Sequence, residues 1–152
     1  MTKEELKAKL TELVPTATFD ETGEWLAILI DTKDWLPLAL QLRNYFDLQF
    51  DYLFNITGVD WKTHLSVVYH LRSTKLEHIL VVKAKIADRN NPEIETVSHI
   101  WRTAEFHERE AYDLFGIKFL HHPDLRRLFL TDEWVGFPLR KDYEDPLNMI
   151  KL

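Results

Sequence analysis

The sequence predicts an α+β protein. A β-sheet backed by helices is expected over residues 1–116, followed by an extended, irregular C-terminal segment over residues 117–152. Three observations support this division. Two stretches place apolar residues at the three- and four-residue steps of a helix. Two later runs alternate in the manner of a β-hairpin. No period continues after Gly116, and three prolines interrupt the remainder of the chain: Pro123, Pro138 and Pro146.

The helical periodicity predicts a first helix over residues 2–14. Thr2 and Glu5 form a capping box at its start, and Pro15 ends it. A second helix is expected over residues 35–46, with a proline tolerated in its first turn and an apolar stripe along one side.

The strand signals fall between and after these helices. Trp25 to Ile30 is apolar on both faces, as expected for a central strand. The next strand is expected to break at Gly58, and the two alternating runs after it form the clearest hairpin. The expected strands are, in order, 16–20, 25–30, 49–61, 65–72 and 76–86. Two helical pieces are then predicted over 94–101 and 104–115, with Gly116 as a left-handed C-cap residue.

The composition excludes several classes of site. The chain has no cysteine, so it can hold neither a thiolate-bound iron–sulfur cluster nor a sulfur-containing zinc site. Its four glycines are too far apart for a dinucleotide-binding or P-loop motif. The net charge of −6 argues against nucleic-acid binding. No apolar run is long enough for a transmembrane helix, and the N-terminus lacks a secretory signal, so we expect a reducing, cytoplasm-like compartment.

The stretch from Glu105 to Tyr143 carries the most information. Between residues 117 and 141, basic side chains outnumber acidic ones by five to three, and large apolar residues lie between them. This pattern favours docking on a partner. On the preceding helix, Glu105, Arg109 and Asp113 are four residues apart and can form a ladder of ion pairs. The alternative for all these charges is an ordinary solvated surface.

The same stretch also contains side chains that can bind metal. His107, Glu110, His121 and His122 could supply ligands to a free-standing metal hydrolase, and Asp124 lies nearby in the sequence. The helix reads His-Glu-x-x-Ala rather than His-Glu-x-x-His, and no second Glu-x-x-His pair is present for a di-iron site. We therefore expect no bound metal, and we interpret His122, which precedes a proline, as a loop residue that caps a turn.

Three runs in this stretch carry a resemblance. Residues 108–117 read EREAYDLFGI, residues 122–127 read HPDLRR, and residues 136–143 read GFPLRKDY. In this order they resemble the hallmark of the C subunit, also called the 30 kDa subunit, in the peripheral arm of respiratory complex I (NADH:quinone oxidoreductase). The motifs cover about a quarter of the chain, and the N-terminal part agrees in layout.

The resemblance implies a non-catalytic structural subunit of a proton-translocating enzyme. It implies that this chain binds no cofactor, whereas FMN, iron–sulfur clusters and quinone are bound by partner subunits. The implied partners are the large subunit that forms the quinone site and other hydrophilic subunits of the complex. The implied location is the cytoplasmic face of the cell membrane, or the matrix or stromal side in an organelle, without a membrane span. At this length we expect the chain to be separate from the large subunit.

The same resemblance implies that the charged and aromatic residues of the motifs form an interface or a polar network, and that none is catalytic. These residues are Glu108, Arg109, Glu110, Asp113, His122, Arg126, Arg127, Trp134, Arg140, Lys141 and Asp142. Related subunits occur in membrane-bound energy-converting hydrogenases and in dehydrogenases that use ferredoxin or F420. The motif alone does not separate these possibilities.

Overall fold

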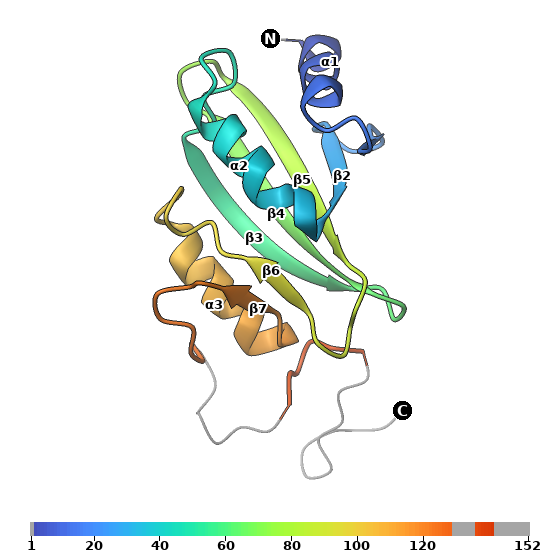
Figure 1. Ribbon diagram of the computed structural model, residues 1–152, viewed down its shortest axis with the longest axis vertical. Coiled ribbons are helices and arrows are strands. Elements are labelled where there is room, and N and C mark those ends of the chain that lie inside the picture. The colour runs from blue at the N-terminus through green and yellow to red at the C-terminus, as the bar shows by residue number, and fades with distance from the viewer. Residues whose placement is uncertain (1, 129–135, 142–152) are drawn as a thin grey trace.

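The computed structural model describes residues 2–128 and 136–141 and has the predicted α+β class (Figure 1). Trp134 and Asp142, both predicted site residues, lie outside the described residues. The elements are, in chain order, α1 (Lys3–Leu13), β1 (Thr18–Asp20), β2 (Ala27–Asp31), the 3₁₀ turn η1 (Thr32–Asp34), α2 (Trp35–Asn44), β3 (Tyr52–Asp60), β4 (Leu65–Ser73), β5 (His78–Ile86), β6 (Glu93–Glu95), α3 (Ala104–Phe115) and β7 (Lys118–Leu120).

The main sheet has five strands in the order β1-β2-β5-β4-β3. The nine-residue strands β3, β4 and β5 form an antiparallel meander, and β2 pairs in parallel with β5. This arrangement confirms the predicted hairpin and the interior position of β2. It also shows that β2 is buried on one face only, because Leu29 is 37% exposed whereas Ile28 and Ile30 are buried.

The helices α1 and α2 pack on one face of this sheet, and α3 lies beside β3 at the end where β6 and β7 gather (Figure 1). Trp35 and Leu38 of α2 share a single core with Tyr69 of β4 and Val82 of β5, all fully buried or nearly so. Trp101, from the turn before α3, extends this core, and its ring stacks 6.2 Å from that of Trp35. One apolar core therefore joins all layers of the described fold.

The ends of the helices follow the capping residues. The Thr2 hydroxyl accepts a hydrogen bond from the Glu5 amide, so the predicted start of α1 is confirmed. Gly116 has a φ of 76° and donates its amide to the Tyr112 carbonyl, which confirms the left-handed C-cap of α3. Helix α2 ends at Asn44, two residues earlier than predicted, and Phe46 is 83% exposed.

Three predictions about regular structure were wrong. Strand β3 has no break at Gly58, which pairs with Val67; the irregularity lies near Leu53 instead. The helical piece predicted over 94–101 is absent: residues 93–95 form a strand, in which Ile94 pairs with Phe119 of β7, and residues 96–103 form turns. The same pairing places strand β7 in the C-terminal segment, which was expected to be irregular throughout. Such long-range pairing outweighs a local pattern that fits either helix or strand.

Candidate functional site around the C-terminal segment

The predicted site residues that are described gather where the C-terminal segment lies against α3 and the ends of β3 and β5. Asp113 lies in α3 and is completely buried. The Arg127 guanidinium donates to its carbonyl at 2.9 Å and to its carboxylate at 3.1 Å, and the Leu128 amide donates to the same carboxylate. Arg127 also donates to the Gly136 carbonyl at 2.8 Å. One buried ion pair therefore holds both the residues before 129 and the residues after 135.

Arg109 supports the same segment from the helix. Its guanidinium donates to the carbonyls of Arg126 and Arg127 at 3.3 and 3.1 Å. The expected ladder along α3 is thus replaced, for Arg109 and Asp113, by bonds that lead across to the C-terminal segment. Because these bonds fix backbone as well as side chains, the segment runs over α3 along a defined path.

Phe137 fills the space between the helix end and the arginines. The Arg127 and Arg140 guanidinium carbons lie 4.7 and 5.8 Å from its ring centroid, and the Tyr112 ring lies 6.1 Å away. A Cβ on Gly116 would lie 2.6 Å from this ring. The glycine is therefore needed twice at this position, for its positive φ and for the close approach of Phe137.

Glu108 lies on another side of α3 and is fully buried. Its carboxylate accepts hydrogen bonds from the Thr96 hydroxyl and from the Val97 amide, which closes the loop after β6 onto the helix. Burial raises the pKa of Glu108 to about 7, although both hydrogen bonds oppose this shift. Glu108 therefore joins α3 to the β6 loop within this chain.

His122 confirms the expectation of a histidine that caps a turn. Its side chain is 0% exposed, and its Nδ1 accepts the Asp124 amide at 2.9 Å. The hydrogen consequently resides on Nε2, which donates to the Glu105 carbonyl at 3.1 Å and lies 3.8 Å from the Glu108 carboxylate. This imidazole joins the chain after β7 to the first turn of α3.

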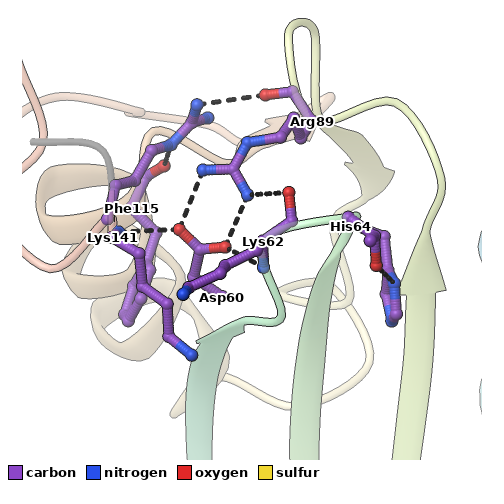
Figure 2. Close-up of polar contacts among 8 residues, drawn as sticks. Asp60, Lys62, His64, Arg89, Phe115 and Lys141 are labelled. Carbon is purple, nitrogen blue, oxygen red and sulfur yellow. Dashed lines mark hydrogen bonds and ion pairs between the residues drawn. The ribbon is translucent and has the colours of Figure 1, made fainter.

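A second group of connected residues consists of Asp60, Lys62, Arg89, Arg140 and Lys141. Of these, the sequence predicted only Arg140 and Lys141 as site residues. Asp60, the last residue of β3, is buried, and it forms a bidentate pair with Arg89 at 2.5 and 2.9 Å (Figure 2). Its carboxylate also accepts the backbone amides of Lys62 and Lys141, each at 2.8 Å. The Arg89 guanidinium beside it holds the pKa of Asp60 well below its usual value, against the effect of burial.

Arg140 extends this group to the end of α3. Its Nε donates to the Phe115 carbonyl at 2.6 Å, and its Nη1 donates to the Arg89 carbonyl at 3.0 Å. Both contacts lie within the chain. Arg140 therefore holds the C-terminal segment to its own domain, which adds a folding role to the interface role expected from the sequence.

Other predicted residues face outward. The Arg126 side chain is 65% exposed, and it pairs with Asp124 at 3.0 Å on an exposed turn. Glu110 is half-buried and lines a small hollow between α3 and the edge strand β3, near Leu139, which is 53% exposed. These side chains are accessible for contact with another protein.

The residues that could act as metal ligands are not gathered into one site. Nδ1 of His121 lies 2.8 Å from the Glu95 carboxylate, whereas the His122 ring is committed to backbone groups. Within residues 2–128 and 136–141, no group of three or more His, Asp or Glu side chains is arranged to hold a metal ion. Over the same residues, no helix is long and apolar enough to cross a membrane.

The buried carboxylates of the site connect segments of the chain to one another. Glu108 and Asp60 each accept two or more hydrogen bonds from other segments of the chain, and Asp113 accepts bonds from Arg127 and Leu128. Carboxylates engaged in this way are poorly placed to act as bases, but they hold backbone in place effectively. Asp113 and Asp60 attach the C-terminal segment to the folded domain, and Glu108 attaches the β6 loop.

Comparison with known proteins identifies the family that this chain resembles in sequence. Residues 28–147 match the family described as the respiratory-chain NADH dehydrogenase, 30 Kd subunit. The C subunit of NADH-quinone oxidoreductase from Chlorobium phaeobacteroides is 39% identical over 142 residues, covering 91% of this chain and 84% of the relative. The C/D subunit of NADH-quinone oxidoreductase from Phocaeicola vulgatus is 52% identical over 103 residues, and the match covers 67% of this chain and only 20% of that protein.

A solved structure agrees with the sequence comparisons. A chain in the membrane-bound sulfane sulfur reductase, an archaeal respiratory membrane complex, superposes with a TM-score of 0.71 and 26% identity, covering 93% of this chain and 85% of that chain. The match in both sequence and fold confirms the resemblance expected from the three motifs. The chain belongs to the family of the 30 kDa subunit of respiratory-chain NADH dehydrogenase.

Proposed function

We propose that this protein is a non-catalytic structural subunit in the peripheral arm of a proton-translocating NADH:quinone oxidoreductase. The observation that carries the proposal is the C-terminal segment itself. It is attached to the domain through Asp113, Asp60 and His122, while Arg126 and Leu139 of the same segment stay exposed. A segment held on one side and exposed on the other is suited to contact a second protein.

The proposed partner is the large subunit that forms the quinone site. The relatives named as C/D subunits support this choice, because the match covers only about a fifth of their length. A single polypeptide that contains both parts keeps them together by covalent linkage. In this proposal, this chain achieves the same proximity through the surface of its C-terminal segment.

The cofactors in this proposal belong to partner subunits. FMN, iron–sulfur clusters and quinone would be held by other chains, and the absence of cysteine from this sequence supports that assignment for the clusters. The chain would act at the cytoplasmic face of the membrane as a peripheral subunit. Its contribution to turnover would be indirect, through the position of the large subunit.

A second candidate function has one observation in its favour. The similarity to a chain of the sulfane sulfur reductase complex fits an equivalent subunit in a complex with another electron donor or acceptor. Membrane-bound energy-converting hydrogenases and ferredoxin- or F420-dependent dehydrogenases fall in this class. In either case the role of the chain is attachment, and the two candidates differ only in the catalytic partners.

Affinity purification of the tagged full chain from native membranes tests the proposal. We expect the large quinone-site subunit and flavin-containing NADH-binding subunits in the purified complex by mass spectrometry. Recovery of hydrogenase-type or F420-binding subunits in their place would support the second candidate. Recovery of the chain alone, under conditions that keep the rest of the complex intact, would contradict both.

A matched pair of variants then separates docking from folding. Arg126→Ala removes an exposed side chain, so we expect reduced recovery of partners with an unchanged melting temperature of the chain. Lys75→Ala, on the exposed turn between β4 and β5, serves as the control and should leave both readings unchanged. Normal recovery with Arg126→Ala would remove this residue from the proposed interface.

A further inference from the structure

We propose that Asp60 is a positioning residue, which fixes the place of residues 139–141 against the folded domain. This inference rests on the proposed function, because it assigns to Asp60 the correct presentation of the C-terminal segment to the partner protein. Asp60 lies in none of the sequence motifs that point to the family. Its role is inferred from the contacts that its carboxylate makes at the end of β3 (Figure 2).

The Asp60 carboxylate joins three parts of the chain that are far apart in sequence. It accepts two bonds from Arg89, which lies 29 residues later, and one from the amide of Lys141, which lies 81 residues later. A fourth bond comes from the nearby Lys62 amide. Four donors match the roughly four lone-pair sites of a carboxylate, so its geometry is fully determined by these partners.

Burial of Asp60 and Arg89 holds the Asp60 carboxylate in one orientation. The Asp60 side chain is 1% exposed and that of Arg89 is 17% exposed, so water competes poorly for either group. The Arg89 guanidinium also donates to the Lys62 carbonyl at 2.9 Å, which fixes the orientation of its planar fork. The Lys141 amide therefore meets an acceptor whose position is set by the domain rather than by the C-terminal segment.

Arg140, the residue just before Lys141, is also held to the folded domain. Its side chain bonds to the carbonyls of Phe115 and Arg89, and the Leu139 amide bonds to the Leu114 carbonyl at 3.0 Å. Residues 139–141 are thus held, one after another, to the end of α3, to the β5–β6 connection and to the end of β3. Ordering these residues before docking lowers the entropic cost of binding, which is the physical benefit of such positioning.

A purely structural role for Asp60 makes a different prediction. If the Asp60–Arg89 pair served only the stability of the sheet, its loss would weaken the domain as a whole. If it serves positioning, its loss releases the Lys141 amide and disturbs docking, and residues 139–141 lose more protection than the sheet does. Amide hydrogen exchange distinguishes the two, because it reports the opening of each segment separately.

The experiment compares Asp60→Asn with Asp51→Asn in the full chain. Asp51 precedes β3, at the opposite end of that strand, and its carboxylate accepts hydrogen bonds from the amide and the hydroxyl of Thr74. It is therefore an aspartate with a comparable local role but no contact with the C-terminal segment among the described residues. Asn keeps the size of the side chain in both variants and removes the charge.

For Asp60→Asn we expect exchange at the amides of residues 139–141 to become faster by about tenfold more than any increase in β4 and β5, which report the global loss of stability. The same variant, expressed in the native host, should recover several-fold less of the complex in affinity purification. Asp51→Asn should leave both readings at the wild-type level. Arg89→Lys, which keeps the positive charge but loses the bidentate geometry, should show the effect expected of Asp60→Asn if the latter fails to fold.

Two results would overturn the positioning role while the proposed function stands. One is unchanged exchange at residues 139–141 in a folded Asp60→Asn chain. The other is normal recovery of the complex by that variant, when the wild-type chain is recovered normally. If the wild-type chain itself recovers no partner proteins, the proposed function fails, and the positioning role fails with it.

Discussion

Arg127 and Asp113 form a buried ion pair that joins the C-terminal segment to α3. The side chains are 10% and 0% exposed, and the guanidinium reaches both the carboxylate and the carbonyl of the aspartate. The neighbouring Arg126 pairs with Asp124 at 3.0 Å, but those side chains are 65% and 50% exposed. Two adjacent arginines with the same charge thus have opposite environments.

This contrast predicts different costs for the two alanine variants. Arg127→Ala leaves a buried carboxylate without its main partner, so it should lower the free energy of unfolding by about 3–5 kcal/mol. Arg126→Ala should change it by less than about 0.5 kcal/mol, because an exposed pair contributes little. Chemical denaturation of both chains measures the difference. Equal destabilisation by the two variants would show that the Arg127 pair contributes no more than a surface one.

The raised pKa of Glu108 predicts that the free energy of unfolding falls as the pH rises. Burial raises its pKa from 4.5 to about 7, so the folded state prefers the protonated form. The stabilising contribution is present in full below the unfolded-state value of 4.5, and it is lost as the pH rises through about 7. Over this window the loss is about 3 kcal/mol for this one group.

Glu108→Gln tests this prediction, because glutamine keeps the shape and is neutral at every pH. Its carbonyl oxygen can accept the Val97 amide, and its amide can donate to the Thr96 hydroxyl. The free energy of unfolding of this variant should depend less on pH than that of the wild type between about pH 5 and 8. Glu110→Gln on the same helix is the matched control. If the free energy of unfolding of the Glu108→Gln chain depended on pH as steeply as that of the wild type, the raised pKa of Glu108 would be contradicted.

Asp60 predicts the opposite dependence in acid. Hydrogen bonds from Arg89 hold its pKa well below the ordinary 3.8, so its contribution is present above 3.8 and is lost as the pH falls toward the folded-state value. The difference in free energy of unfolding between wild type and Asp60→Asn should be constant above about pH 5 and shrink below about pH 4. Urea titrations from about pH 7 to about pH 2 measure it. A constant difference throughout would mean that the carboxylate is not stabilised in its charged form.

The parts of the fold that the sequence could predict are those with local causes. The Thr2 cap, the Gly116 cap and the β4–β5 hairpin each depend on residues close to one another in the chain. Strand β6 was misread as helix because Ile94 and Val97 fit a helical step equally well, and only the distant partner β7 decides between the two.

The candidate site divides in the same way. The motif residues on α3 and the C-terminal segment could be found from their spacing, although the sequence could not show that Arg140 binds within the chain. Asp60 and Arg89 were missed because 29 residues separate them and neither lies in a periodic or motif pattern. An aspartate at the end of a predicted strand was the one local signal, and it is too common to be specific.

The contact of Gly58 with Phe115 gives a final prediction about how α3 is seated on the sheet. Gly58 lies within β3, and a Cβ added there would lie 2.6 Å from Cδ2 of the Phe115 ring. Gly58→Ala should therefore lower the free energy of unfolding by about 1–3 kcal/mol, the usual cost of overpacking. Phe115→Leu in the same chain should recover part of this loss, because leucine lacks the ring atoms that meet the new methyl group. Gly23→Ala is the control, since nothing lies within 4 Å of its added Cβ, and it should be nearly neutral. If Gly58→Ala were equally neutral, α3 could move away from β3 at little cost, and the Arg140–Phe115 bond at its end could not hold the C-terminal segment in one place.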